Sequence, residues 1–166
     1  MCGIAGYFNP DQNYAENPKQ NFHTLSRMIN TMNHRGPDTY GHTIINSCCL
    51  AHTRLSIIDL ENGRQPMSYT KDGNTYYIVY NGEIYNYKEV KKTLLRKNYT
   101  FETNSDTEVI IAAFCHYGPG FVKELNGIFA IAIYDSMRNT LYLYRDRFGV
   151  KPLYLSLIHI SEPTRL

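Results

Sequence analysis

Strand-length apolar segments lie toward both ends of this 166-residue chain, and helical patterns lie between them. Alternating or continuous apolar residues predict strands at 1–8, 43–45, 48–58, 75–80, 83–85, 128–134 and 140–144. Apolar residues at three- and four-residue spacing predict helices at 22–32, 87–97 and 106–117. Because the strands do not alternate regularly with helices, the order indicates a single α+β domain and not repeated βαβ units.

Local signals indicate where some of these segments begin and end. Pro37 disfavours a helical conformation in the residue before it, so 34–38 is predicted to be a loop. Ser105 and Glu108 have the spacing of a capping box, which places Asp106 in the first turn of the third helix. That helix is mostly apolar, so we expect it to be more deeply buried than the second.

The charge pattern argues against several classes of partner. The 17 basic and 15 acidic residues give a net charge of +2 and are interspersed. This balance predicts neither nucleic acid nor an anionic membrane as a partner. No apolar run approaches the roughly 20 residues that span a bilayer. The N-terminus lacks basic residues ahead of its apolar stretch, unlike a secretory signal. We therefore expect a cytoplasmic protein.

The four cysteines and six histidines predict neither disulfides nor a metal site. The sequence has no C-x-x-C pair, no H-x-x-x-H motif and no His/Cys spacing typical of metal ligands. Cys48, Cys49 and Cys115 lie in apolar segments, where a free cysteine usually packs as a small buried side chain.

Cys2 differs from the other cysteines because it follows the initiator methionine. Removal of Met1 would leave a thiol and a free α-amino group on one residue. In peptides these two groups ionise within about one pH unit of each other. The amine can therefore take the thiol proton and later return it to a leaving group. Cys2 is thus a candidate N-terminal nucleophile, although a cysteine at this position can also lack any function.

The dipeptide Asn81-Gly82 has two interpretations. It is a strong hairpin signal, which predicts a turn between the strands at 75–80 and 83–85. An Asn side-chain amide next to a Gly N–H can also form an oxyanion hole, where one donor stabilises the transition state of amide cleavage by about 3–4 kcal/mol. The local sequence leaves both interpretations open.

Two charged residues could complete a substrate site. Arg54 lies within an apolar strand, so it is at a sheet edge, pairs with an acid, or reaches the carboxylate of a ligand. Asp106 is favoured by the helix dipole and could also face an ammonium group. A thiol, two oxyanion donors, a cation and an anion together match the requirements for binding and cleaving glutamine.

Eight motifs follow one another along the chain: MCGIAGYF at 1–8, HRGPD at 34–38, AHTRLSIIDL at 51–60, QP at 65–66, NGEIYNY at 81–87, SDTE at 105–108, LNGIFAIAIYD at 125–135 and RDRFGVKPLY at 145–154. In this order they resemble the glutaminase domain of bacterial glutamine-dependent asparagine synthetases, a class II glutamine amidotransferase. The resemblance implies an N-terminal-nucleophile hydrolase fold. This fold is a four-layer αββα sandwich with two antiparallel sheets between helical layers.

The resemblance also implies catalytic roles. Cys2 resembles the nucleophile after removal of Met1, while the Asn81 amide and the Gly82 N–H resemble the oxyanion hole. Attack of the thiol on glutamine would give a γ-glutamyl thioester and ammonia, and water would then release glutamate. The implied reaction needs no cofactor in this domain.

Further positions resemble substrate-binding residues. Arg54 resembles the residue that binds the glutamine α-carboxylate, and Glu83 and Asp106 resemble those on the α-ammonium side. Two positions resemble residues that line the pocket: Leu55 and Ile57. The segment Arg35 to Asp38 resembles a loop that covers the site.

The family resemblance implies a second domain that uses ATP, Mg²⁺ and the ammonia to convert aspartate into asparagine. Its Ser-Gly-Gly-x-Asp-Ser motif is not found in this sequence. We therefore expect 1–154 to be a C-terminally truncated glutaminase domain. The segment 155–166 resembles a translated sequencing adaptor, and we expect it to be an artefact and not native sequence.

The expected partners are glutamine and the synthetase domain of the full-length protein, and a homodimer is an open alternative to a monomer. The acceptor of the ammonia also has alternatives, because amidophosphoribosyltransferases and sugar amidotransferases share this kind of glutaminase. A non-catalytic module with the same fold is a third alternative.

Overall fold

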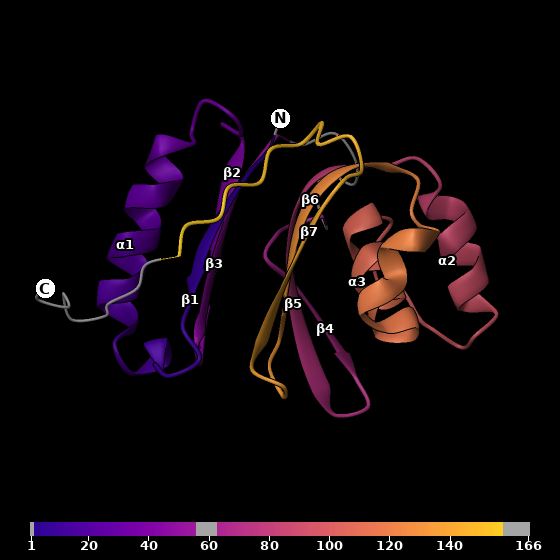
Figure 1. Cartoon of the computed structure of the whole chain (residues 1–166), viewed down its shortest axis with the longest axis horizontal. Helices are drawn as coiled ribbons and strands as arrows, with labels where there is room; N and C mark the ends of the chain where they lie inside the picture. Colours follow the sequence, from indigo (N-terminus) through magenta and orange to yellow (C-terminus); the bar gives the residue numbers. More distant parts are fainter. Residues whose placement is uncertain (1, 56–62, 158–166) are drawn as a thin grey trace, which may run out of the picture.

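Two antiparallel sheets lie between helices in the computed structural model, which describes residues 2–55 and 63–157 (Figure 1). The first half contains β1 (Gly3–Phe8), α1 (Pro18–Thr31), β2 (Thr39–Ile45) and β3 (Cys48–Arg54). The second half contains β4 (Met67–Lys71), β5 (Asn74–Ile84), α2 (Tyr87–Leu95), α3 (Asp106–Tyr117), β6 (Gly127–Asp135) and β7 (Thr140–Arg145). Short 3-10 helices span Tyr14–Glu16 and Gly118–Glu124.

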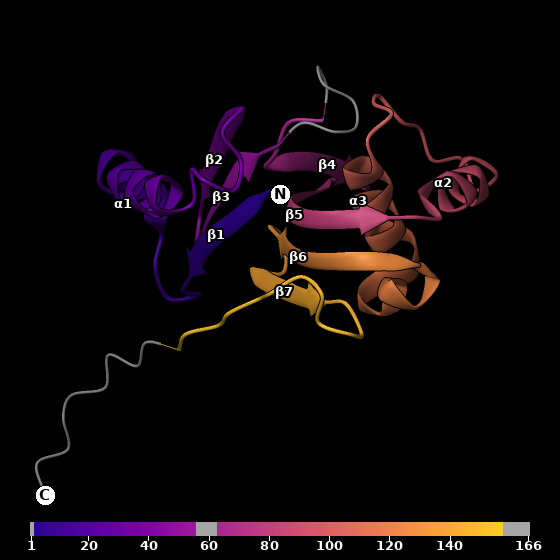
Figure 2. The ribbon, with the colours of Figure 1, turned by 90° about the horizontal axis from the view of Figure 1, so that it is seen from above.

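These elements form four layers. The strand order is β1-β3-β2 in the first sheet and β4-β5-β6-β7 in the second. Helix α1 covers the outer face of the first sheet, and α2 and α3 lie on the outer side of the second (Figure 1). Figure 2 shows from above that these helical layers lie on opposite sides of the two sheets. The predicted α+β fold and its αββα layering are therefore confirmed.

Helix α1 contacts the first sheet through one narrow face. It begins with Pro18, which is well suited to the first helical position because its missing N–H has no intrahelical partner there. Leu25 and Ile29, one turn apart, are its buried residues. They pack in a small cluster with Cys49 and Ala51 of β3. This is the amphipathic arrangement that the sequence spacing predicts.

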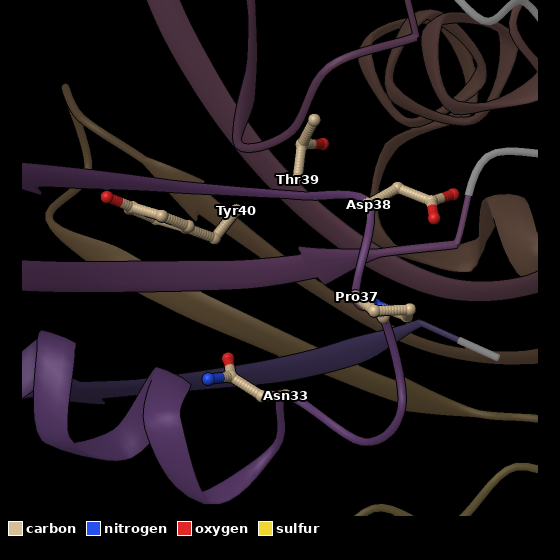
Figure 3. A pocket seen from close by; sticks show the side chains of 6 residues that line it. Asn33, Pro37, Asp38, Thr39 and Tyr40 are labelled. Carbon is tan, nitrogen blue, oxygen red and sulfur yellow. The ribbon is translucent and has the colours of Figure 1, made fainter.

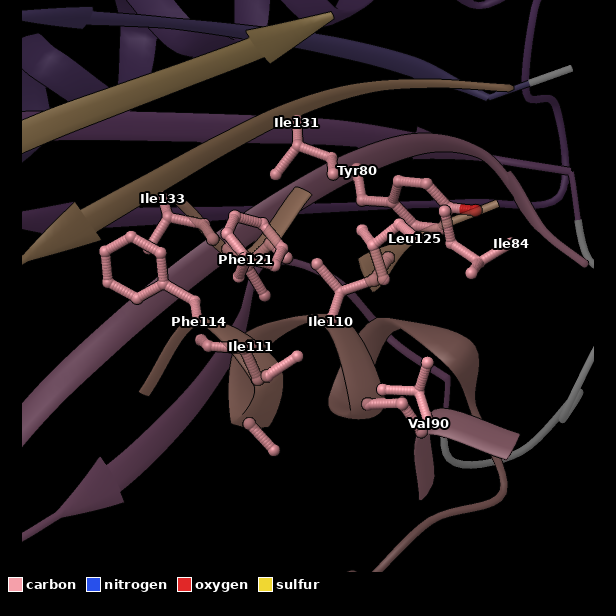
Figure 4. Close-up of a cluster of buried hydrophobic side chains, with 14 of the residues drawn as sticks. Tyr80, Ile84, Val90, Ile110, Ile111, Phe114, Phe121, Leu125, Ile131 and Ile133 are labelled. Atoms are coloured by element: carbon pink, nitrogen blue, oxygen red, sulfur yellow. The ribbon is translucent and has the colours of Figure 1, made fainter. Parts of the chain in front are cut away.

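Helix α3 is buried along most of its length, as its apolar composition predicts. Every residue from Asp106 to Phe114 is buried. The apolar members of this run join Ile131 and Ile133 of β6 in the largest hydrophobic cluster (Figure 4). Helix α2 and the 3-10 helix Gly118–Glu124 contact α3, so α3 has little solvent-facing surface.

The predicted capping box of α3 forms in part. The Ser105 hydroxyl oxygen accepts a hydrogen bond from the Thr107 N–H at 3.2 Å. The Glu108 carboxylate accepts from the backbone N–H groups of Glu102 at 2.8 Å and Thr103 at 2.7 Å, and not from the Ser105 N–H, which donates to the Thr103 hydroxyl. Glu108 therefore fixes the segment that enters the helix.

The predicted hairpin turn at Asn81-Gly82 is wrong. Both residues lie inside the continuous strand β5, where Asn81 pairs with Ala130 and Gly82 pairs with Phe129 of β6. A Cβ atom at position 82 would collide with the carbonyl oxygen of Ile128. Glycine is thus required here for close strand approach and not for a turn.

Strand β4 was not predicted, and several boundaries differ from the expected ones. Strand β4 pairs with β5 at the edge of the second sheet. Strand β2 begins at Thr39, four residues before the predicted start. The predicted strand 48–58 is observed as far as Arg54, and its residues 56–58 lie outside the described part of the chain. Helix α2 ends at Leu95, two residues before the predicted end.

The prediction of buried side chains for Cys48, Cys49 and Cys115 is confirmed for the first two and in part for the third. Cys48 and Cys49 on β3 are fully buried, and Cys115 on α3 is half-buried. Burial raises the pKa of each of these thiols, to about 12 at Cys115.

Within residues 2–55 and 63–157, no helix has both the length and the apolar content that crossing a membrane requires.

Candidate active site

Side-chain alternation places three of the predicted site residues on surfaces that face the space between the sheets. The inter-sheet cluster contains Leu50 and Val79, with Ile4 packed against it. In an extended strand, residues separated by an even number of positions point to the same face of the sheet. Three predicted residues therefore lie on these inward faces: Cys2, Arg54 and Asn81.

These three residues also lie toward the same end of the sandwich. In the antiparallel first sheet Gly3 pairs with Thr53, so the adjacent residues Cys2 and Arg54 lie on the same side of that pair. Burial raises the pKa of Tyr80, the neighbour of Asn81 on β5, and the charge of Cys2 makes a smaller contribution. Strands β1 and β5 contact each other across the two sheets, so Cys2 lies on the side of the first sheet that faces the proposed oxyanion donors.

The thiol itself is half-buried and contacts the end of β3. Cys2 Sγ lies 3.7 Å from the carbonyl oxygen of Leu55, a residue predicted to line the pocket. The Arg35 Nε–H donates to the Cys2 carbonyl oxygen at 3.2 Å. Met1 and Ile57 lie outside the described residues, so the prediction for Ile57 stays a prediction.

The segment 34–38 is the loop that the sequence predicts, and it lies against β3. Pro37 forms an isolated parallel bridge with Arg54, and the Asp38 N–H donates to the Arg54 carbonyl oxygen at 3.1 Å. A Cβ at Gly36 would lie only 2.5 Å from the carbonyl carbon of Thr53. Glycine therefore allows the loop to lie flat on the strand that carries Arg54.

An open depression of about 610 Å³ lies beside this loop (Figure 3). Its lining residues are Asn33, Gly36, Pro37, Asp38, Thr39 and Tyr40. Figure 3 shows the labelled side chains arranged around the turn that joins α1 to β2. This lining includes neither Cys2 nor Asn81, so the depression is not the proposed catalytic centre.

The position of Arg54 excludes one of the three interpretations open from sequence, a place at a sheet edge. Strand β3 is the central strand of its sheet, with Thr39 of β2 paired to Arg54, so the residue is not at a sheet edge. Its side chain is buried, with 6% relative exposure. A guanidinium is normally buried only with partners for its charge and its N–H groups, which leaves an internal partner or a ligand carboxylate.

The proposed donor segment lies near the end of β5. Asn81 is buried at 5% exposure, Gly82 is half-buried and Glu83 is exposed. Exposure therefore increases along these three residues. The next residue, Ile84, is buried again.

Asp106 is buried and bound to β5 from the helical side. Its Oδ2 accepts a hydrogen bond from the Tyr80 hydroxyl at 2.9 Å. The backbone amides of Ile84 and Thr107 also stabilise the charged form of the carboxylate. Burial outweighs these hydrogen bonds and raises the pKa of Asp106 above its ordinary value.

Two further residues close to the site were not identified as functional from the sequence: Tyr80 and Gln65. Burial raises the pKa of Tyr80, and the charge of Asp106, which accepts a hydrogen bond from its hydroxyl, raises it further. The Gln65 Oε1 accepts from the Tyr80 N–H at 2.6 Å. Gln65 is part of a motif that supports the family resemblance, but no local pattern indicates this contact.

His52 is a third residue close to the site that was not identified as functional from the sequence. It lies on the inward face of β3, is 1% exposed and is close to the Tyr80 backbone on the facing sheet. Burial lowers its pKa to about 4, so the imidazole is neutral at physiological pH.

Across residues 2–55 and 63–157, no group of three or more His, Cys, Asp or Glu side chains is arranged to hold a metal ion.

Comparison with solved structures supports the fold. The chain is similar to glutamine phosphoribosylpyrophosphate amidotransferase from B. subtilis, complexed with ADP and GMP, with a TM-score of 0.54 and 21% identity. The match covers 66% of this chain and 25% of that chain. At this identity the similarity shows the fold alone.

Sequence relatives give a closer similarity. Asparagine synthetase [glutamine-hydrolyzing] 3 of Bacillus subtilis (strain 168) is 41% identical over 154 residues, which are 93% of this chain and 24% of that protein. Asparagine synthetase B [glutamine-hydrolyzing] of Escherichia coli (strain K12) is 40% identical over 155 residues, 93% of this chain and 27% of that protein. The chain thus spans about a quarter of the length of these relatives.

A family model described as a glutamine amidotransferase domain matches residues 1–163. This match covers nearly the whole chain, and it agrees with the sandwich fold. The chain therefore belongs to the glutamine amidotransferase domain family.

Proposed function

We propose that this domain hydrolyses glutamine to glutamate and ammonia, with Cys2 as the nucleophile. The observation that carries the proposal is the convergence of groups from both sheets at one end of the sandwich. Cys2 and the buried Arg54 come from the first sheet, and Asn81 comes from the second. This set supplies a nucleophile, a partner for a carboxylate and an oxyanion donor.

In the first step, the Cys2 thiol attacks the side-chain amide carbon of glutamine. The free α-amine of Cys2, exposed after removal of Met1, takes the thiol proton and passes it to the departing nitrogen. The C–N bond breaks, ammonia leaves and a γ-glutamyl thioester remains. The Asn81 amide and the Gly82 N–H stabilise the developing oxyanion.

In the second step, water attacks the thioester carbon. The same amine takes a proton from the water and returns it to the cysteine sulfur as the C–S bond breaks. Glutamate is released and the free thiol is restored. Arg54 holds the substrate α-carboxylate throughout, and Asp106 and Glu83 lie on the α-ammonium side.

We further propose that the ammonia is used to make asparagine from aspartate in a synthetase domain of a longer, cytoplasmic protein. The relatives named asparagine synthetase and the order of the eight motifs support this acceptor. In this proposal, ATP and Mg²⁺ serve the synthetase domain, and the glutaminase chemistry uses only side-chain and backbone groups of this domain.

Glutamate release from glutamine tests the nucleophile. We expect Cys2→Ala to lower kcat by at least about a thousandfold, because no other group can form the thioester. Cys115→Ala is the matched control and should retain activity, since Cys115 lies within the helical layer on α3. Unchanged hydrolysis in Cys2→Ala would refute the assignment.

Mass spectrometry of the purified protein tests the role of the α-amine. We expect the measured mass to equal that of the chain without Met1. Retention of Met1 would leave Cys2 without a free amine and would favour a non-catalytic module of the same fold.

The KM for glutamine tests the carboxylate role of Arg54. We expect Arg54→Ala to raise KM by about 100-fold with a smaller change in kcat, because the lost interaction is present in both substrate and transition state. Arg27→Ala, at an exposed position on α1, is the control. Unchanged kinetic constants in Arg54→Ala would show that the residue has a structural partner instead.

A further inference from the structure

Tyr80 has a polar contact within an otherwise apolar environment. Its ring belongs to the large hydrophobic cluster and is 3% exposed (Figure 4). Its hydroxyl donates to Asp106 Oδ2 at 2.9 Å. Figure 4 shows the ring among labelled core side chains of the same cluster, which include Ile84 and Leu125. A phenylalanine would fill the same space without this hydrogen bond, so the hydroxyl requires an explanation beyond packing.

The backbone of Tyr80 is held by a second link to the same helix. The ladder between β4 and β5 ends at the pair Met67 and Ile78, so no β4 backbone group is paired with Tyr80. The Gln65 side chain takes that place: its Oε1 accepts from the Tyr80 N–H at 2.6 Å. Its Nε2 donates to the Thr107 hydroxyl at 3.2 Å. Tyr80 is therefore tied to the first turn of α3 through both its side chain and its backbone.

These links surround the proposed oxyanion donors. Tyr80 directly precedes Asn81, and Ile84 follows two residues after Gly82. The Asp106 carboxylate accepts a hydrogen bond from the Tyr80 hydroxyl, and the Ile84 backbone also favours its charged form. Asp106 therefore interacts with β5 on both sides of the donor segment.

We propose that Tyr80 is a positioning residue for glutamine recognition, whose hydroxyl orients the Asp106 carboxylate toward the substrate α-ammonium. The proposal rests on the glutaminase function and on the ammonium role of Asp106 proposed above. A carboxylate has about four acceptor positions, so it can hold one hydroxyl and one backbone amide and still accept from an ammonium. Gln65 supports the arrangement by keeping β5 and α3 in a fixed relation.

The ionisation of Asp106 is consistent with this role. Burial favours the neutral carboxylic acid, and the Tyr80 hydroxyl is the first hydrogen bond that opposes this effect. Removal of the hydroxyl would leave a carboxyl group that is less well oriented and harder to ionise. Both changes weaken the binding of a cation.

A double-mutant cycle in the intact protein tests the proposal, with glutamine KM and kcat as readouts. We expect Tyr80→Phe to raise KM by about 10-fold with kcat within about twofold, since a hydrogen bond to a charged group is lost. Asp106→Asn should raise KM at least as much. In the Asp106→Asn background, Tyr80→Phe should add no more than about a twofold effect, because the two residues act through one interaction.

Tyr134→Phe is the matched control for Tyr80→Phe. It removes a tyrosine hydroxyl from the same sheet whose hydrogen bond, to Asn139, is also 2.9 Å long. We expect no change in KM for this variant. Gln65→Leu leaves the Tyr80 ring in place and should also raise KM, so it provides a second test if Tyr80→Phe does not fold.

The outcomes separate this proposal from the proposed function. If Asp106→Asn raises KM while folded Tyr80→Phe and Gln65→Leu do not, Tyr80 has no positioning role and the glutaminase assignment stands. If Tyr80→Phe has the same effect with and without Asp106→Asn, the hydroxyl acts elsewhere and the proposal is overturned. If Asp106→Asn leaves KM unchanged, the ammonium role itself is wrong and this inference is overturned with it.

Discussion

Helices α1 and α3 cover the two outer faces of the sandwich, but they are buried to very different extents. In α1 only Leu25 and Ile29 are buried, whereas α3 is buried from Asp106 to Phe114. The first sheet therefore carries a single amphipathic cover. The second sheet carries a thicker layer in which α2 and the 3-10 helix at Gly118–Glu124 also contact α3.

This difference matches the division of proposed roles between the halves. The thinly covered half, which contains β1, α1, β2 and β3, supplies the proposed nucleophile Cys2 and the proposed carboxylate partner Arg54. The thickly covered half supplies Asn81 and Asp106, whose positions depend on contacts between β5 and α3. Oxyanion donors must be held rigidly to stabilise a transition state, and a deeply packed layer provides that rigidity.

Truncation of a buried core side chain gives the largest expected single effect, and this effect should differ between the two halves. Leu94 on α2 and Leu25 on α1 are both fully buried, but Leu94 lies in the largest cluster and Leu25 in a small one. We expect Leu94→Ala to cost about 4 kcal/mol and Leu25→Ala about 3 kcal/mol, since a densely surrounded cavity collapses less. Urea unfolding measures both values. A larger loss at Leu25 would contradict the comparison.

The second prediction concerns transition-state stabilisation by the thickly covered half. We expect Asn81→Ala to lower kcat about 10²- to 10³-fold, equivalent to about 3–4 kcal/mol, with a small change in KM. Steady-state glutamate release measures the effect. Asn126→Ala is the control and should leave kcat unchanged, because Asn126 is exposed and directly precedes β6. A pure KM effect of Asn81→Ala would assign that side chain to binding instead.

The third prediction tests the contact between the halves at His52, which reaches the Tyr80 backbone. Its pKa is lowered from 6.5 to about 4 by burial, so the unfolded chain binds the proton first as the pH falls. Stability is therefore lost between pH 6.5 and about 4, by about 3 kcal/mol in total. Urea unfolding of wild type and His52→Asn across this range measures the difference in slope.

We expect His52→Asn to lose less stability than wild type over this pH range, because the substituted side chain does not titrate there. His23→Asn, at an exposed site on α1, should keep the wild-type slope. Parallel curves for wild type and His52→Asn would show that the imidazole is not held neutral by the fold.

The smallest expected difference lies at the helix starts. Ser105 caps α3 through its side chain, whereas Asn17 makes no side-chain capping hydrogen bond to α1. We expect Ser105→Ala to cost about 1 kcal/mol and Asn17→Ala a few tenths of that. Thermal unfolding of the two variants checks this order, and equal losses would show that the cap contributes little.

The sequence predicts most of the fold where a local pattern and the tertiary structure agree. Helix α3 has the predicted bounds because Ser105 caps its start and Gly118, with a positive φ of 69°, ends it. Asn81-Gly82 was predicted to turn because the local hairpin signal is strong. Pairing with β6 along the whole of β5 overrides that signal, and no local pattern contains this long-range contact.

The same limit applies to the candidate site. The residue types at Cys2, Arg54 and Asn81 suggest their chemistry without any coordinates. The hydrogen bonds of Tyr80 join it to Asp106, 26 positions away, and to Gln65, 15 positions away. Such contacts arise from the packing of α3 on the sheet, so sequence spacing alone does not reveal them.

The contrast among the four cysteines has a practical consequence for assays. Thiol-directed reagents attack the thiolate, which burial disfavours at Cys48, Cys49 and Cys115. Cys2 is more accessible than the fully buried pair on β3. One equivalent of a mild alkylating agent would therefore titrate the proposed nucleophile, and it would report the fraction of molecules with a reactive Cys2 before any activity measurement.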